Sequence, residues 1–119
     1  YKSIAVICKT ENESKVVHEN LLKHVKIENY DTKIDLINKD SNVFTSGIVV
    51  IPSYLSKGLE FDAVIIYDAS MKGYSHEEER KLFYTMCTRA LHCLRIYFKG
   101  TLSPFISKAD KGLYDFVEL

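Results

Sequence analysis

The spacing of hydrophobic residues changes twice along the first part of the chain. Residues 3–8, SIAVIC, are a short apolar run rich in β-branched side chains, which predicts a buried strand. The next segment, residues 9–25, spaces its apolar residues as a helix does and has an acid-rich start. Residues 31–38, DTKIDLIN, alternate and predict a second strand, and the polar residues 39–47 predict a loop. The apolar stripe expected on the helix is Val16, Val17, Leu21, Leu22 and Val25.

The later part of the chain continues this alternation. Residues 76–92, HEEERKLFYTMCTRALH, predict a helix with three glutamates in its first turn, where the helix dipole favours them. A loop is expected over residues 70–76, ahead of this helix. The expected strands are GIVVIP at 47–52, DAVIIYDA at 62–69 and LRIYF at 94–98, with LYDFVEL at 113–119 as a candidate for a last one.

Apolar strands that alternate with helices indicate a largely parallel sheet covered on both faces. The 119 residues suit a single domain, and a composition that is 46% apolar and 27% charged favours an ordered globular fold. We therefore expect one α/β domain over residues 1–119, a three-layer unit of RecA-like or Rossmann-like pattern. Because ligands of such sheets gather at the carboxyl ends of strands, the residues after Ile7, Ile51 and Ile66 are the first place to look for a site.

The charge balance and the cysteines limit which partners and which cellular compartment we expect. Sixteen basic residues balance sixteen acidic ones, so any site for nucleic acid must be local. The apolar runs are shorter than a membrane span, and we expect no membrane partner. The odd number of cysteines, without a CxxC, favours the cytoplasm, and the spacing of Cys87, His92 and Cys93 matches no familiar zinc pattern, so no metal site is expected. The chain begins with Tyr1 rather than Met, which suggests a piece of a longer protein.

The connection between the strands at 47–52 and 62–69 carries more chemistry than a turn needs. It contains Lys57 and Gly58, and glycine allows a backbone to approach a ligand closely. Residues 56–61 suit one helical turn, whose exposed amides favour an anion or a sugar hydroxyl. Glu60 is a carboxylate between Leu59 and Phe61, and such acids near strand ends accept hydrogen bonds from ribose. A solvated turn with Glu60 on the surface is the alternative interpretation.

The helix predicted over 76–92 places an arginine beside its apolar stripe. Arg89 lies about 110° from the centre of the stripe, on the flank of Thr85, where a helix meets a neighbouring body. The alternative is a surface arginine paired with Glu78 or another acid. The stripe itself consists of Leu82, Phe83, Met86, Cys87, Ala90 and Leu91.

Taken together, two segments resemble motifs of a known family. VVIPSYLSKGLEFDAVII resembles motif V, and RKLFYTMCTRALHCLRIYF resembles motif VI, of superfamily 1 helicases of the UvrD/Rep type, in the expected order. SIAVICKTENES stands where that family has motif IV. The resemblance covers essentially the whole chain as a second, C-terminal RecA-like domain. It implies the motor domain of an ATP-dependent, 3′-to-5′ DNA helicase or translocase.

The resemblance also implies roles for single residues. Arg89 matches the arginine finger, which reaches the γ-phosphate of ATP. Glu60 matches the glutamate that holds the ribose, Gly58 the backbone beside the triphosphate, and Lys57 belongs to the same motif. Lys9 falls where motif IV usually offers an arginine to the γ-phosphate, and a lysine keeps the charge but loses the bidentate fork.

A DNA-facing element is implied next to this motif. Tyr54 stands where many members have a histidine near the single strand, so Ser53 and Tyr54 are the expected contacts to single-stranded DNA. Tyr54 would stack on a base, or it packs inside the domain. The Pro-Ser-Tyr form is similar to the HelD-like branch, whose members act on RNA polymerase. The second interpretation of the chain is therefore a non-catalytic RecA-like module that binds a protein partner such as RNA polymerase.

The chain lacks the phosphate loop of an ATPase. No GxxxxGK[ST] occurs in the sequence, and Asp68, at the end of an apolar strand, has no acidic neighbour after it as a Walker B aspartate would. We therefore expect that this chain alone does not hydrolyse ATP. The Mg²⁺ ion and the β-phosphate would be held by an upstream RecA-like domain of the same polypeptide.

Overall fold

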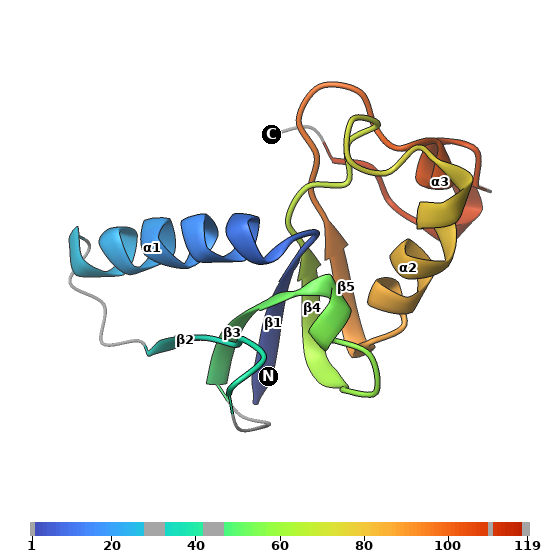
Figure 1. Ribbon diagram of the computed structural model, residues 1–119. Coiled ribbons are helices and arrows are strands. Elements are labelled where there is room, and N and C mark those ends of the chain that lie inside the picture. Colours follow the sequence, from blue (N-terminus) through green and yellow to red (C-terminus); the bar gives the residue numbers. More distant parts are fainter. Residues whose placement is uncertain (1, 28–32, 42–46, 110, 118–119) are drawn as a thin grey trace.

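The sheet is parallel throughout (Figure 1). The computed structural model describes residues 2–27, 33–41, 47–109 and 111–117, and within them five strands pair in the order β2-β3-β1-β4-β5. Because all pairs are parallel, the carboxyl ends of the strands share one edge of the sheet and the amino ends share the other. The α/β class with a mostly parallel sheet is thereby confirmed. The strands are β1 (Ser3–Cys8), β2 (Ile34–Leu36), β3 (Gly47–Pro52), β4 (Phe61–Ile66) and β5 (Ala90–Ile96).

One long helix covers each face of the sheet. On one face, α1 (Glu11–Ile27) packs over β1, β2 and β3, with Val17 buried against Val6 and Val50. On the other face, Phe83 and Met86 of α2 (Glu77–Cys87) pack against Ile7, whose side chain points away from that of Val6 because side chains alternate along a strand. The three layers that the sequence predicts are present. The remaining helical elements are short: α3 (Pro104–Ser107) and the 3₁₀ turns Ser53–Leu55 and Lys111–Leu113.

The stripe predicted on α1 is only partly correct. Val17 is buried, and Leu21 and Val25 are half-buried against the core, but Val16 and Leu22 are exposed. The helix touches the sheet along one narrow line, and these two residues lie on its flanks. None of the helices in the described part of the chain is long and apolar enough to cross a membrane.

The helix predicted over 76–92 is confirmed for residues 77–87 and wrong for its last five residues. The helix ends at Cys87, and β5 begins at Ala90 because residues from there on pair with β4, across a bulge between Phe61 and Ala63. Ala90 still packs on the core, but from a strand, and Leu91 is 53% exposed. Helical spacing could not show this change, because apolar residues three and four apart also occur in an irregular edge strand.

The chain ends differ from the prediction as well. Residues 114–117 have no regular structure, so the candidate strand at 113–119 is wrong as far as it is described; residues 118–119 lie outside the described part. The strand predicted at 31–38 is reduced to Ile34–Leu36, and residues 31–32 also lie outside it. Phe116 instead packs its ring 6.0 Å from that of Phe98, centroid to centroid.

Candidate functional site

The segment Ser53–Glu60, called the elbow here, crosses the sheet from one edge to the other. It leaves the carboxyl end of β3 and must reach the amino end of the parallel strand β4. Its single helical turn is Ser53–Leu55, closed by Ser56, whose hydroxyl donates to Ser53 O at 2.7 Å. The helical turn predicted over residues 56–61 is therefore wrong: Lys57 and Gly58 form a turn that Leu59 N closes by donating to Ser56 O at 3.1 Å, and Glu60 follows without regular structure.

The apolar side chains of the elbow fix its path. Leu55 and Leu59 pack against the core, and Phe61, directly after the elbow, is 3% exposed. Together with β3 they wall a pocket of about 200 Å³. The elbow is thus not a loose surface turn, although the solvated alternative is correct for the side chain of Glu60. The pocket is lined by Ile37, Asn38, Lys39, Ser41, Val49, Ile51, Leu55, Leu59 and Phe61.

The polar residues of the elbow are directed to solvent. Lys57, Gly58 and Glu60 are exposed, and neither charged side chain makes a hydrogen bond or ion pair with any described residue. Gly58 has a φ of +83°, in the left-handed region that side chains other than glycine rarely adopt, and the space beside its Cα is open. A free carboxylate, a free ammonium and an accessible backbone therefore lie within four consecutive residues.

Arg89 lies in the turn between α2 and β5 and is held against the elbow. Its Nη1 donates to Leu59 O at 3.3 Å, its Nε to Thr85 O at 3.0 Å, and its Nη2 to the hydroxyl of Thr88 at 3.1 Å. The backbone carbonyl of Arg89 in turn accepts from Phe61 N at 2.9 Å. Within the described residues no carboxylate lies within 4.0 Å of its guanidinium, so the pairing with Glu78 considered above is wrong.

Arg89 and Glu60 share one edge of the sheet, but it is the amino-terminal edge. Glu60 directly precedes β4 and Arg89 directly precedes β5, and Phe61 pairs with Ala90. The expectation that the site gathers after the carboxyl ends of the strands is wrong for these two residues. The reason is that the elbow and α2 both run back across the sheet before the next parallel strand begins.

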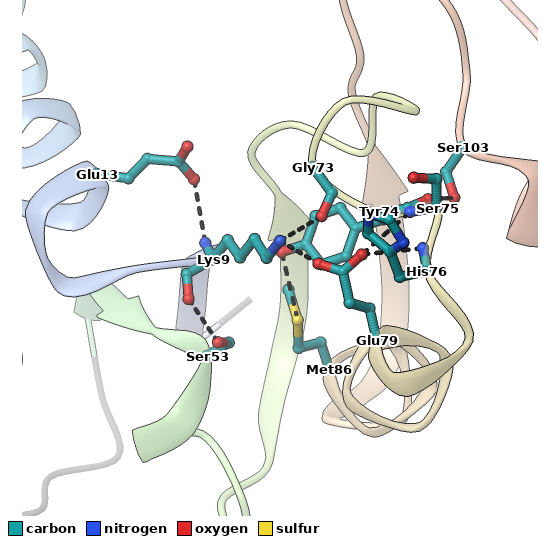
Figure 2. Close-up of polar contacts among 10 residues, drawn as sticks. All are labelled: Lys9, Glu13, Ser53, Gly73, Tyr74, Ser75, His76, Glu79, Met86 and Ser103. Atoms are coloured by element: carbon teal, nitrogen blue, oxygen red, sulfur yellow. Dashed lines mark hydrogen bonds and ion pairs between the residues drawn. The ribbon is translucent and has the colours of Figure 1, made fainter.

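Lys9 lies at the opposite edge. It follows the last residue of β1, so the six-residue length of the neighbouring strand β4, roughly 20 Å at about 3.3 Å per residue, separates its backbone from that of Arg89. The ammonium of Lys9 donates to the carboxylate of Glu79 and to Gly73 O, and it lies 5.4 Å from the centre of the Tyr74 ring (Figure 2). The structure does not bring Lys9 together with Arg89.

The backbone of Lys9 forms hydrogen bonds with side chains from two other segments. Its N–H donates to Glu13 Oε1 of α1 at 3.0 Å, and its carbonyl accepts from the Ser53 hydroxyl at 2.7 Å (Figure 2). The Ser53 side chain is therefore buried and already bonded, which does not favour its predicted contact with DNA. That role stays a prediction from the sequence.

Tyr54 is open to a partner. Its side chain is 52% exposed, so the alternative of a packed interior tyrosine is wrong. The hydroxyl donates to Glu11 Oε2 at 3.4 Å, and partial desolvation and the charge of Glu11 raise the pKa of Tyr54. The ring is free to stack, whereas the carboxylate beside the hydroxyl repels a phosphate. Stacking on a base stays a prediction.

Two residues of this edge were not singled out from the sequence. Glu79 accepts from His76 N at 3.0 Å and from Ser75 N at 3.3 Å through Oε1, and from Lys9 through Oε2. Burial favours the protonated form, but these hydrogen bonds outweigh it and lower the pKa of Glu79. Tyr74 is buried against Met86. The signal for Glu79 was its place three residues after the helix cap, where glutamates commonly bond back to the backbone.

Asp68 has a local role. Its Oδ1 accepts from Ser70 N at 3.1 Å, so the carboxylate closes the turn that follows β4. That bond is a common use of aspartate in turns and needs no metal ion.

A parallel sheet with a helix on each face is the architecture of RecA-like and Rossmann-like domains, and here the turn before β5 is also bonded to the elbow. Comparison with known proteins makes the assignment more specific. Residues 47–97, from β3 to just past β5, match the family described as UvrD-like helicase C-terminal domain. The crystal structure of the C-terminal domain of a possible DNA helicase from Lactobacillus plantarum WCFS1 is similar with a TM-score of 0.77 and 37% sequence identity over 95% of this chain.

These two matches assign the chain to C-terminal domains of UvrD/Rep-type helicases, as the resemblance of motifs V and VI predicts. This chain spans 66% of the Lactobacillus chain, so that chain holds further residues without a counterpart here. A search of curated proteins found no match.

Proposed function

We propose that this chain is the C-terminal motor domain of an ATP-dependent 3′-to-5′ DNA helicase or translocase. In this proposal it supplies Arg89 and the elbow to an ATP site that an upstream RecA-like domain of the same polypeptide completes. The observation that carries the proposal is the contact between Arg89 Nη1 and Leu59 O. Through this contact the guanidinium, which has no carboxylate partner among the described residues, is bonded to the residue between the exposed Gly58 and Glu60.

Each of these groups suits one part of ATP. Phosphoryl transfer is accelerated mainly by positioning and by cations placed where charge develops, which is the role proposed for Arg89. The exposed carboxylate of Glu60 accepts hydrogen bonds from ribose hydroxyls, and the open backbone at Gly58 admits the phosphate chain. The Mg²⁺ ion would be held by the upstream domain, and we assign no residue of this chain to it.

Arg89 does not have to leave the elbow to act. A guanidinium has five N–H donors, and its contacts with Thr85, Thr88 and Leu59 use one on each nitrogen. The two remaining donors, one on each terminal nitrogen, suit two oxygens of one phosphate. The three existing bonds hold the fork in place, so little entropy is lost when phosphate binds.

The test is the substitution Arg89→Ala in the full-length protein. We expect the single-turnover rate of ATP hydrolysis to fall by roughly 10³-fold or more while ATP affinity changes little, because the lost interaction is made mainly in the transition state. Arg95→Ala is the matched control, since Arg95 is an exposed arginine of β5 and should leave the rate unchanged. A near-wild-type rate for Arg89→Ala would overturn the proposal.

Single-stranded DNA is the second proposed ligand, with Tyr54 as its stacking platform. An exposed aromatic ring stacks on any base, and such contacts are worth about 1–3 kcal/mol each. Neither the family match nor the structural neighbour supports RNA polymerase as a partner, and that alternative stays a prediction from the sequence.

The cytoplasm remains the proposed location. All three cysteines are free thiols, as expected in a reducing compartment. Burial raises the pKa of Cys87 to about 11, and burial together with the charge of Glu13 raises that of Cys8 to about 12, so neither thiol is activated for chemistry.

A further inference from the structure

The ion pair between Lys9 and Glu79, called the clamp here, joins two elements that are far apart in sequence. Lys9 is the residue after β1, the central strand, and Glu79 is in the first turn of α2. The side chains are 33% and 14% exposed, so the clamp is less exposed than the other ion pairs of the described residues. A pair that is shielded in this way holds its geometry better than one at the surface.

Both partners of the clamp are bonded to other groups of the domain. The ammonium of Lys9 also bonds Gly73 O and lies over the Tyr74 ring, while both oxygens of Glu79 accept hydrogen bonds (Figure 2). A phosphate that took over the ammonium of Lys9 would displace Glu79. That would leave a shielded carboxylate without its cation and next to the phosphate charge.

The clamp also bears on where Arg89 lies. From Glu79 to Cys87 the helix rises roughly 12 Å, and Arg89 follows two residues later. Phe83 packs the middle of α2 and Met86 its last turn on the sheet, and the clamp fixes the first turn against the end of β1. A helix of about three turns moves as a rigid rod, so a displacement of its first turn changes the angle at which its last turn meets the sheet.

We propose that Lys9 and Glu79 are positioning residues, which set the tilt of α2 and thereby the place of Arg89, and that Lys9 is not itself a phosphate ligand. This inference rests on the proposed function, because it needs Arg89 to act on ATP. It assigns a role to Glu79 and replaces the direct role that the motif position of Lys9 implies.

The experiment is a double-mutant cycle in the full-length protein. Lys9→Met removes the cation, and Glu79→Gln keeps an oxygen for the amides of His76 and Ser75 while removing the charge. We expect each single variant to lower the single-turnover rate of ATP hydrolysis by a similar factor, roughly three- to thirtyfold, with ATP affinity kept and with the double variant no slower than either single one. Lys9→Arg should restore most of the rate, because it can still pair with Glu79.

Two controls separate positioning from loss of stability. Glu77→Gln removes an exposed carboxylate two residues before Glu79, whose ion pair within the described residues is with Arg80, and it should leave the rate unchanged. In an Arg89→Ala background, Glu79→Gln should cause no further loss, whereas a general weakening of the fold would lower the rate again.

Several outcomes would overturn the inference. Additive losses in the cycle, a Glu79→Gln rate equal to that of Glu77→Gln, or weakened ATP binding in Lys9→Met alone would each show that Lys9 acts without Glu79. These outcomes differ from a failure of the proposed function, which would show as a near-wild-type rate in Arg89→Ala. If folding prevents the use of Lys9→Met, the comparison of Glu79→Gln in the two Arg89 backgrounds still decides.

Discussion

The charged residues at the two edges of the sheet differ in their pairing and exposure. At the carboxyl-terminal edge the cation of Lys9 is paired with Glu79 and shielded by Tyr74. At the amino-terminal edge Glu60 is exposed and Arg89 has no carboxylate partner among the described residues. Opening a shielded pair leaves two charges uncompensated, whereas a charge without a partner is ready for a ligand. The amino-terminal edge is therefore the better candidate for the nucleotide.

This difference shows that a motif position does not by itself fix a role. Lys9 and Arg89 are both expected at the γ-phosphate from the family resemblance, yet within the described part of the chain Lys9 is paired with a carboxylate and Arg89 is not. If the comparison holds, replacing Arg89 reduces ATP hydrolysis by orders of magnitude and replacing Lys9 by a much smaller factor.

The largest effect after that of Arg89 is expected at Glu60. Glu60→Ala should raise the KM for ATP by roughly tenfold or more, since a hydrogen bond to a charged group is worth about 1.5–3 kcal/mol. With a nucleotide that lacks both ribose hydroxyls, Glu60→Ala should raise the KM by a smaller factor. The reason is that this nucleotide lacks the group to which Glu60 bonds. Steady-state hydrolysis of the two nucleotides by both proteins measures this. Equal losses for both nucleotides would remove the ribose role.

The clamp should contribute measurably to folding stability. Glu79→Gln is expected to lower the free energy of unfolding by about 1–3 kcal/mol at neutral pH, and Glu77→Gln, in an exposed pair, by no more than about 0.5 kcal/mol. Urea unfolding of the two variants beside the wild type gives both values. Equal effects would mean that the clamp is no stronger than a surface pair.

The contribution of Glu79 should also depend on pH with a definite sign. Its pKa in the folded protein is lowered from the ordinary value of 4.5, so its contribution is fully present above that value. As the pH falls below 4.5 and through the lowered pKa, the carboxylate is protonated and the contribution is lost. The stability difference between wild type and Glu79→Gln should therefore shrink between neutral and acid pH. A difference that stays constant down to pH values below both pKa values would contradict this.

The smallest effect is expected at Gly58. Gly58→Ala should cost about 1 kcal/mol of stability, because alanine is strained at a φ of +83° although nothing obstructs its methyl group. Thermal unfolding would show this, with Gly73→Ala as a control at a glycine without a positive φ. If Gly58→Ala weakens the free energy of ATP binding by more than it lowers the free energy of unfolding, that result would support the proposal that the open backbone at Gly58 faces the phosphates.

The fold could be predicted further than the site. Buried strands such as SIAVIC and VVIP can be predicted from their apolar, β-branched composition. Their alternation with helices then predicts a parallel sheet. The end of α2 could not be predicted, because Ala90 and Leu91 fit a helical stripe and only pairing with β4 makes them a strand. The same uncertainty hid the position of Arg89 in a turn.

The identities of the candidate residues could be predicted, but their environments could not. Sequence spacing places Lys57, Gly58 and Glu60 in one elbow, and the structure keeps them exposed there. Nothing in the sequence brings Glu79 to Lys9 over a separation of seventy residues. That contact depends on the register of β1 with β4 and on where the loop before α2 turns back.

The most direct test of the central claim is amide hydrogen exchange of the full-length protein with and without a non-hydrolysable ATP analogue. If the amino-terminal edge faces the nucleotide, exchange should slow in the peptides that cover residues 56–60 and 88–89 and stay unchanged over residues 72–76, beside the clamp. Slowed exchange over residues 9–10 and 72–76, with none over the elbow, would contradict the account and place the nucleotide at the opposite edge of the sheet.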